Sequence, residues 1–527
     1  MSLSQTSFLF IDCQTTGMRP PQGRILEIAW SLATPEQAGL APVHSRLIRL
    51  PEGETIPKTV ARITGLDDQA MLESVDEQIA FLELQALIAA QRERLHCVIH
   101  YATFEKPFLV DWFERLGATS TLPFEILCSH RLSKSLLPNL PSQNLRAVAG
   151  YFGEPVSTVN RAGSHVTSTH IVWRGLCLEL EKNGIQTANQ IQDWAKAKPK
   201  SLKPEKLEYR LEKVKRLELP DQPGVYRMLA KTGEVLYVGK ATSLKSRVNS
   251  YFRGQKNRDR RKLEMLAQVW DLEVTTCNSP LEAALVENDE IKRLDPPYNV
   301  VFKRFDRRLS FYSRDFVNVS DQQSEEFPLG PFRGSGNLES VRLLHRSIVT
   351  AEFNLPIFYT EIPEADLRQG FEIFLDKFGI KAEDLRHGIR SLMAVGMGFF
   401  RHHVEETVEV TENQDQEETP EEKILTPEDV AGKYERLLRR AAGEYHRACL
   451  MTKLLDTDIT WGPAGKENHL SLHHGQLRTP QLPRKESPWP WLDLDIETYD
   501  RLSILISELN KHPHQVTPRQ GSNFPLA

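Results

Sequence analysis

Residues 7–195 carry the hydrophobic pattern of an α/β domain. A continuous apolar run at residues 8–11, which ends at Asp12, predicts a buried strand. Strand patterns and helical patterns then follow one another along the chain. The further predicted strands are 25–32, 45–50 and 97–99, and the predicted helices are 76–94, one that starts near Thr103, 144–152 and 168–181.

A second, compact segment also has mixed helical and strand patterns. Two strand patterns, at 225–229 and 235–239, are separated by a short glycine-containing turn. Ser279, followed by Pro280, predicts the start of a helix, because serine caps the first turn and proline suits its geometry. The remaining elements predicted here are a helix at 243–252, a strand at 272–277 and an end of the late helix before Pro296.

Composition divides the rest of the chain. A basic, proline-punctuated stretch and an acidic stretch without aromatic residues indicate linkers, and we find no internal repeat. The expected fold class is α/β multidomain with a mostly helical C-terminal region. The predicted segments are 7–195, a linker at 196–212, a domain at 213–320, a helical extension at 321–400, an acidic disordered linker at 401–425, a helix and hairpin region at 426–511, and a tail at 512–527.

The composition excludes several classes of protein. The apolar share of 40% and the charged share of 26% are those of ordinary globular chains. No window is long and apolar enough to span a bilayer, and the N-terminus lacks the pattern of a secretory signal. The six cysteines are scattered without a CxxC pair, which argues against a structural zinc site and a disulfide framework. We therefore expect a reduced, cytoplasmic protein without a membrane partner.

The charge of the chain is unevenly distributed. The net charge is only −5, yet nine basic residues and one acid lie between Lys240 and Lys262. A basic block in an acidic chain points to a polyanionic partner, and the alternative is a solvated helix face. The residues predicted to contact nucleic acid are Lys245, Arg253, Arg258, Arg260, Arg261 and Lys262.

The second segment contains an ordered set of motifs. Gly224-Val225-Tyr226 is followed eleven residues later by Tyr237-Val238-Gly239, and then by Lys240, Arg247, Tyr251, Glu287 and Asn299. This set resembles the GIY-YIG nuclease family, in particular the N-terminal nuclease domain of the UvrC and Cho excision nucleases. The resemblance covers about residues 215–320 and implies a small α/β nuclease domain. The alternative is that the tyrosines are core residues and Glu287 is a solvated acid.

The resemblance implies roles for these residues in phosphodiester cleavage. It implies one divalent metal, Mg²⁺ or Mn²⁺, held by Glu287, which suits a hard cation with mostly water ligands. Tyr237 is the candidate general base, and we expect Lys240 and Arg247 to lower its pKa. Arg247 would contact the scissile phosphate. The residues expected to position water and phosphate are Tyr226, Tyr251 and Asn299.

The first segment resembles a second nuclease family, the DEDD exonucleases that include the epsilon subunit of bacterial replicases. Its first motif reads Asp12-Cys13-Gln14-Thr15-Thr16-Gly17, its second reads His100-Tyr101-Ala102-Thr103-Phe104-Glu105, and its third places His165 five residues before His170. The resemblance covers about residues 7–183 and implies an RNase H-like fold.

The departures from that family fall on the metal ligands. Asp12 is retained, but Gln14 replaces Glu, Glu105 replaces Asp and His170 replaces Asp. Two divalent ions are poorly held by two carboxylates, and His165, which matches the general base, does little without them. We expect a catalytically inactive domain retained for binding or structure. Weak activity with one metal is the alternative.

Together the two resemblances predict a metal-dependent DNA endonuclease of the nucleotide-excision-repair class. The GIY-YIG domain would nick one strand of a damaged or distorted duplex, and a UvrB-like helicase that loads onto damage is a candidate partner. In a bacterium the protein would act at the nucleoid. Two alternatives remain: a 3′→5′ exonuclease of the epsilon type with an accessory GIY-YIG domain, and a catalytically silent repair scaffold.

Overall fold

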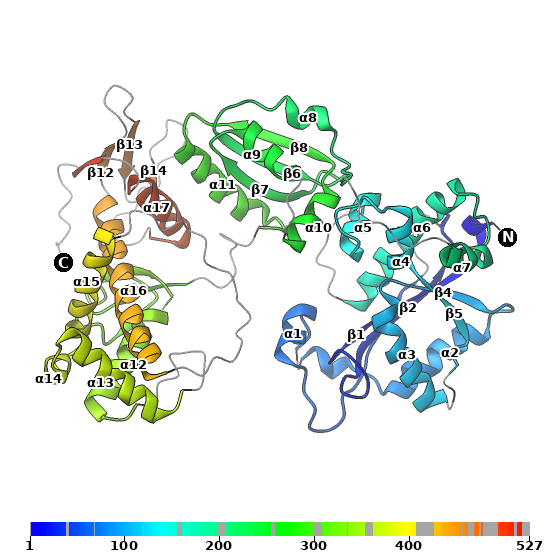
Figure 1. Ribbon diagram of the computed structural model, residues 1–527, viewed down its shortest axis with the longest axis horizontal. Helices are drawn as coiled ribbons and strands as arrows, with labels where there is room; N and C mark the ends of the chain where they lie inside the picture. Colours follow the sequence, from blue (N-terminus) through cyan, green and yellow to red (C-terminus); the bar gives the residue numbers. More distant parts are fainter. Residues whose placement is uncertain are drawn as a thin grey trace. The chain divides into compact units, whose positions relative to one another are not determined.

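The computed structural model divides the chain into two compact units, Met1–Lys303 and Arg304–Ala527 (Figure 1). Among the described residues, no helix combines the length and the apolar composition needed to cross a membrane. The structure describes all residues except 1, 38–41, 68, 118, 120, 155–160, 198–206, 254–258, 300–307, 335, 354–361, 407–425, 456, 462–467, 474–475, 478–493, 511–513 and 519–527.

The N-terminal part of the first unit is built on a five-stranded sheet with the order β3-β2-β1-β4-β5. β2 runs antiparallel to β1 and β3, whereas β4 and β5 run parallel to β1. This order and these directions confirm the RNase H-like fold that the sequence predicts. The strands are β1 (Phe8–Thr15), β2 (Ile25–Ala33), β3 (His44–Leu47), β4 (Leu95–Ile99) and β5 (Phe124–Cys128).

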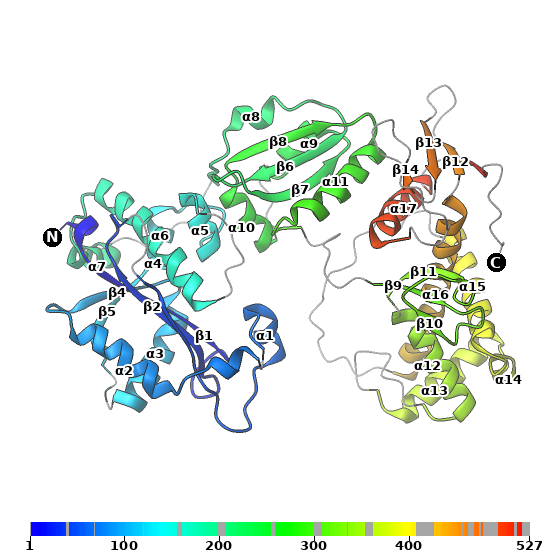
Figure 2. The ribbon, with the colours of Figure 1, turned by 180° about the vertical axis from the view of Figure 1, so that it is seen from behind.

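Helices cover both faces of this sheet (Figure 2). Phe8 and Phe10 pack in one cluster with Trp173 of α6, and Leu9 and Ile11 pack in another with residues of α2 and α3. Because both faces are buried, β1 reads as a continuous apolar run rather than an alternating one. The helices are α1 (Lys58–Thr64), α2 (Glu77–Ala89), α3 (Ala102–Gly117), α4 (Ser129–Leu136), α5 (Leu145–Phe152), α6 (Ala162–Lys182) and α7 (Ala188–Ala197), with 3₁₀ turns at Leu3–Gln5 and Ala70–Glu73.

The second part of the first unit is an antiparallel three-stranded sheet with the order β7-β6-β8. Val225 and Val238 pack against α11 on one face, and Tyr226 packs with residues of α9 and α10 on the other. Ser279 caps α11 by accepting from the Glu282 N–H, as predicted. The elements are α8 (Lys213–Leu217), β6 (Gly224–Leu229), β7 (Val235–Ala241), α9 (Leu244–Ser250), α10 (Arg260–Gln268), β8 (Asp271–Thr276) and α11 (Pro280–Leu294).

The C-terminal end of the predicted linker at 196–212 packs against the first domain and the GIY-YIG-like segment. Residues 198–206 lie outside the described part, but those that follow are packed. Leu211 is buried, the Glu208 N–H donates to the Asn139 carbonyl, and the Arg210 guanidinium lies 3.8 Å from the Tyr151 ring centroid. The composition missed this because basic residues can bury their stems against aromatic rings.

The second unit combines helices with two small sheets, ordered β10-β9-β11 and β14-β13-β12-β15. Its core gathers Phe371 and Phe374 of α13 around Tyr434 of α16. The elements are β9 (Leu309–Tyr312), β10 (Val319–Ser320), β11 (Leu329–Arg333), α12 (Gly336–Thr350), α13 (Glu364–Phe378), α14 (Ala382–Leu385), α15 (Ile389–Glu406), α16 (Pro427–Leu454), β12 (Thr457–Trp461), β13 (Asn468–His473), β14 (Gln476–Leu477), α17 (Ile496–Leu509) and β15 (His514–Pro518).

Three predicted boundaries need correction here. β9 and β10 pair within the second unit, so the preceding domain does not extend to residue 320. α15 runs to Glu406, into the predicted acidic linker, of which 407–425 lie outside the described residues. β15 pairs with β12, so part of the predicted tail is a strand. Strand pairing depends on residues that are distant in sequence, and local hydrophobic patterns do not reveal such pairs.

Candidate active site

The two tyrosine motifs of the second domain lie on neighbouring strands. Tyr226 on β6 pairs in register with Gly239 on β7. A Cβ at position 239 would collide with the Tyr226 hydroxyl, so only glycine lets the ring lie across the strand. The spacing of the two motifs therefore produces one cluster.

Three tyrosines form this cluster. The Tyr226 and Tyr251 hydroxyl oxygens are 2.8 Å apart, and the ring centroids of Tyr226, Tyr237 and Tyr251 lie 6.1 to 6.4 Å from one another. Arg247, from the last turn of α9, places its guanidinium 5.3 Å from the Tyr251 ring centroid. The structure thus brings four of the predicted catalytic residues together.

Glu287 lies beside the same strand. It is 9% exposed, and its Oε1 accepts from the backbone N–H of Lys240 at 2.9 Å. The Lys240 ammonium lies 3.8 Å from Oε2. Burial raises the pKa of Glu287, and Lys240 opposes that rise. The carboxylate is therefore held next to Tyr237 by the backbone of β7.

Arg247 lowers the pKa of Tyr237 as expected, but burial outweighs this effect and the net shift is upward. Burial raises the pKa of Tyr237 well above its ordinary value, Tyr251 and Glu287 add to the rise, and Arg247 only partly opposes it. Burial dominates because the phenolate would lose its hydration, and the exposed Arg247 guanidinium does not replace that hydration. In the protein alone, Tyr237 keeps its proton at neutral pH.

Asn299 is bonded to β7 through both polar atoms of its side-chain amide. It is buried, its Oδ1 accepts from the Val238 N–H at 2.9 Å, and its Nδ2 donates to the Val238 carbonyl at 2.9 Å. The amide is engaged with the edge of β7 rather than directed at solvent. We propose that Asn299 positions the strand that carries Tyr237.

The exposed basic residues lie on α9, just after it and on α10. Asp259 caps α10 by accepting from the Arg261 N–H at 3.0 Å. The Arg261 side chain also donates to the Pro297 carbonyl at 3.0 Å, so part of its hydrogen-bonding capacity is used within the domain. The exposed members of the predicted set are Lys245, Arg253, Arg260, Arg261 and Lys262, and Arg258 lies outside the described residues.

A single divalent cation fits the chemistry of this site. Within the described part of the chain, no group of three or more His, Cys, Asp or Glu residues could hold a metal. Glu287 offers a carboxylate beside the tyrosines, and within the described residues its Oε2 has only the Lys240 ammonium, at 3.8 Å, as a polar partner. One carboxylate with water ligands is a donor set that Mg²⁺ accepts.

Four of the five predicted exonuclease residues of the first domain also meet, namely Asp12, Gln14, Glu105 and His165. Asp12 on β1 accepts from Gln14 Nε2 at 3.2 Å, and its other oxygen lies 3.1 Å from Nδ1 of His165 on α6. Glu105 on α3 is buried, and burial together with the charge of Asp12 raises its pKa strongly. Gln14 therefore places an amide donor where the family pattern has a carboxylate.

His170 does not join this group. Its Nε2 lies 3.0 Å from the Thr34 carbonyl, and its ring meets the Phe10 ring edge-on at 5.3 Å. His100 of the second motif is also a core residue, bonded to Ser129 at 2.9 Å, and burial lowers its pKa to about 3. The hydrogen bonds found for His100 and His170 go to Ser129, Gln143 and Thr34, whereas His165 is the motif histidine bonded to Asp12.

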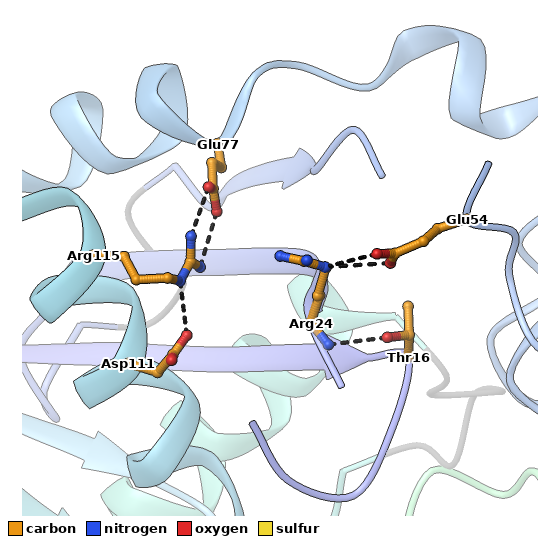
Figure 3. Close-up of polar contacts among 6 residues, drawn as sticks. All are labelled: Thr16, Arg24, Glu54, Glu77, Asp111 and Arg115. Atoms are coloured by element: carbon orange, nitrogen blue, oxygen red, sulfur yellow. Dashed lines mark hydrogen bonds and ion pairs between the residues drawn. The ribbon is translucent and has the colours of Figure 1, made fainter. Parts of the chain in front are cut away.

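Contacts within the loop after β1, and from the loop to Glu54, hold its conformation (Figure 3). The Arg24 N–H donates to the Thr16 hydroxyl at 2.9 Å, and the Arg24 side chain bonds both oxygens of Glu54 at 3.2 Å. On α3, Arg115 is paired with Glu77 and Asp111. The Thr16 hydroxyl thus accepts a hydrogen bond that closes the loop onto the start of β2.

Fold and site together define a chain that joins an RNase H-like, exonuclease-like domain to a small α/β domain with a tyrosine, arginine and glutamate cluster. Residues 222–300 match the family described as the UvrC-like GIY-YIG domain. This part of the chain is therefore a UvrC-like GIY-YIG domain, as the sequence predicts.

Known relatives share parts of the chain. A protein of Mycobacterium tuberculosis (strain CDC 1551 / Oshkosh), named as a candidate bifunctional exonuclease/endonuclease, is 29% identical over 66% of this chain and 53% of its own length. The UvrABC system protein C of Nitrosomonas eutropha is 40% identical over 25% of this chain and 22% of its own length. The chain thus spans about half of the first relative and less of the second.

Two solved structures are also similar. One is the magnesium-bound GIY-YIG domain of UvrC from Thermotoga maritima, with 32% identity over 16% of this chain and 93% of that chain, and a TM-score of 0.15. The other is Exonuclease I of E. coli with a dT13 oligonucleotide, with 15% identity over 43% of this chain and 49% of that chain, and a TM-score of 0.31.

The sequence missed Tyr298 and Glu264 as residues that support the site. The Tyr298 hydroxyl donates to Glu264 Oε1 at 2.6 Å. The position of Tyr298, directly before Asn299 in the motif, could have indicated a role for it. Its partner Glu264 on α10 is 34 residues away, so no local pattern joins the two residues.

Proposed function

We propose that this protein is a metal-dependent DNA endonuclease of the nucleotide-excision-repair class that nicks one strand of damaged DNA through its GIY-YIG domain. The observation that carries the proposal is the convergence of Glu287, Arg247 and the three tyrosines on one edge of the β6–β7 pair. The matched family and the UvrC relatives support it. The substrate would be a damaged or distorted duplex in the bacterial cytoplasm.

Glu287 is the residue that would hold a divalent cation, Mg²⁺ or Mn²⁺. When bound, such a cation supplies positive charge to the phosphate and helps the leaving oxygen depart. The exposed Arg247 guanidinium contacts a non-bridging phosphate oxygen and stabilises the charge that develops there. The buried carboxylate cannot drift, because the Lys240 backbone holds it.

Tyr237 orients the attacking water in this proposal. Its raised pKa means that the resting protein keeps the phenolic proton, so the hydroxyl donates or accepts a hydrogen bond. It accepts the proton of the water only where added positive charge lowers that pKa. Tyr226 and Tyr251 hold the ring in place through their shared hydrogen bond.

The exonuclease-like domain would serve binding or structure. Gln14 occupies one oxygen of Asp12 with an amide donor, and His170 faces Thr34, so two of the four family ligand positions supply no carboxylate. The exposed basic residues of α9 and α10 would contact the DNA backbone. A UvrB-like helicase is a candidate partner that presents the damaged strand.

Incubation of the purified protein with labelled duplex in magnesium tests the proposal. One duplex carries a bulky lesion and its control is undamaged, and each is tested with and without a damage-loading helicase. We expect a single nick near the lesion. Release of mononucleotides from 3′ ends would favour the exonuclease alternative, and binding without any cleavage would favour the silent scaffold.

A further inference from the structure

α5 of the exonuclease-like domain packs against α10 of the GIY-YIG domain within the first unit (Figures 1 and 2). Ala267 of α10 is buried in the core of the exonuclease-like domain, and Trp270 Nε1 donates to the Gly150 carbonyl at 2.9 Å. A Cβ at Gly150 would collide with the Gln268 side chain. Glycine at this position therefore permits the close approach of the two helices.

Glu264 joins the two domains at this contact. Its Oε2 accepts from Asn144 Nδ2 at 2.5 Å, and Arg146 Nη1 lies 3.5 Å from its Oε1. Asn144 also caps α5, since its Oδ1 accepts from the Ala147 N–H at 2.9 Å. The first turn of α5 is thus tied to α10 by a partly buried carboxylate, whose side chain is 15% exposed.

The contact continues from Glu264 to the catalytic strand. The Tyr298 hydroxyl donates to Glu264 Oε1, and Gln268 Nε2 donates to the same hydroxyl at 2.5 Å. The Tyr298 N–H donates to the Leu236 carbonyl at 3.1 Å, and the next residue, Asn299, bonds both backbone groups of Val238. Tyr237 lies between Leu236 and Val238, so an unbroken series of hydrogen bonds links α5 to its strand.

We infer that the α5–α10 contact is an intramolecular docking surface through which the exonuclease-like domain holds strand β7 in its catalytic position. The inference rests on the proposed endonuclease function. Glu264 and Tyr298 become positioning residues that act through Asn299 and Leu236. The exonuclease-like domain then has a role that requires its fold but no nuclease chemistry of its own.

Gly150→Ala in the full chain tests this inference, because it changes no residue of the GIY-YIG domain. The added methyl pushes α5 away from Gln268. The control is Gly163→Ala, in the same domain, where a Cβ would meet Val43 at an ordinary 3.7 Å. Hydrogen exchange of the β7 amides and the kcat and KM of nicking are measured for both variants.

We expect amide exchange in residues 235–241 to become about tenfold faster in Gly150→Ala, because the support of Val238 loosens. The nicking kcat should fall by roughly 10- to 100-fold, as small misplacements of catalytic groups do, while KM stays within about twofold. Gly163→Ala should change neither quantity. Circular dichroism confirms that both variants are folded.

Glu264→Ala and Glu264→Gln give a second comparison that does not depend on Gly150. Glu264→Gln keeps an acceptor for the Tyr298 hydroxyl, so the β7 amides should retain most of their protection from hydrogen exchange. In Glu264→Ala that protection should be lost. If β7 exchange is unchanged in both Gly150→Ala and Glu264→Ala, the inference is overturned whether or not the protein nicks DNA. If wild type never nicks but exchange responds as expected, the proposed function fails and the docking surface stands.

Discussion

Asn299 bonds the backbone N–H and the backbone carbonyl of Val238 at the same time, each at 2.9 Å. β7 is an edge strand, and unpaired backbone groups at an edge are costly when buried and prone to wrong pairing when exposed. Two further backbone groups of β7 are also paired. The Tyr298 N–H donates to the Leu236 carbonyl, and the Glu287 carboxylate accepts from the Lys240 N–H. The late segment of the domain therefore completes the strand that carries Tyr237 and fixes the proposed metal ligand to it.

Glu287→Gln is expected to abolish nicking while leaving DNA affinity intact. The amide still accepts from the Lys240 N–H, but it lacks the charge that holds a hard cation. Loss of several kcal/mol of transition-state stabilisation corresponds to a rate lower by roughly a thousandfold. Single-turnover nicking in magnesium and a filter-binding isotherm measure the two effects.

Glu273→Gln is the matched control for that variant, because Glu273 is an exposed residue on β8 of the same domain. It should nick at the wild-type rate. Near wild-type nicking by Glu287→Gln would show that the metal is held elsewhere.

Tyr237→Phe is expected to lower the nicking rate by roughly 10²- to 10⁴-fold, the usual contribution of a group that handles a proton. Since burial raises the Tyr237 pKa, the wild-type rate should still be rising with pH at mildly alkaline values. The pH–rate profile of the variant should be flat over the same range. A wild-type plateau that begins below pH 7, retained in Tyr237→Phe, would exclude this role.

Glu105→Gln is expected to stabilise the fold at neutral pH. The pKa of Glu105 is raised, first by burial and then by Asp12, so its favourable contribution is present below its unfolded pKa and is lost as pH rises through its folded pKa. The free energy of unfolding of the variant should therefore rise relative to that of wild type as pH increases. The difference should reach roughly 1 kcal/mol or more once the wild-type carboxyl must ionise.

Thermal unfolding of both proteins between pH 4 and pH 8 measures this difference. The exposed Glu114→Gln on the same helix is the control and should show no such trend. A difference that shrinks as pH rises would mean that Glu105 is stabilised in its charged form.

Local patterns predicted the elements on which the site is built, and long-range contacts explain what they missed. The run at 8–11, the cap at Ser279 and the two tyrosine motifs each depend on neighbouring residues, and each is where it was predicted. The acidity of Tyr237 and the partners of Asn299 depend on burial between elements far apart in sequence. The strand β9 was missed because its partner β11 lies beyond the expected boundary.

Neutralisation of the exposed basic residues Arg260, Arg261 and Lys262 to glutamine is expected to weaken binding to all duplexes alike. Phosphate contacts carry no sequence or lesion information. If all three meet phosphates, the slope of log affinity against log salt should become shallower by about 2 to 3. Lys213→Gln on α8, an exposed lysine outside this block, is the control. An unchanged slope would show that these basic residues do not contact phosphates and form a solvated helix face.

The exonuclease-like domain is expected not to degrade DNA at a significant rate. The four family ligand positions hold Asp12, Gln14, Glu105 and His170, and the structure gives each a reason to bind metal poorly. Gln14 donates to Asp12, Glu105 has a raised pKa that favours its neutral form, and His170 is bonded to Thr34. Two-metal cleavage needs an ion on each side of the phosphate, so loss of either costs several kcal/mol.

The assay for this last prediction uses the full chain with Glu287→Gln, which silences the other site, and 3′-labelled single-stranded DNA in magnesium or manganese. No labelled mononucleotide should appear. Release that disappears on further Asp12→Ala substitution would contradict the prediction. Restoring Gln14→Glu, Glu105→Asp and His170→Asp together is the positive control, because it replaces the amide donor and returns the missing carboxylates. Cleavage by that variant alone would show that the fold still presents an exonuclease site and that the ligand changes silenced it.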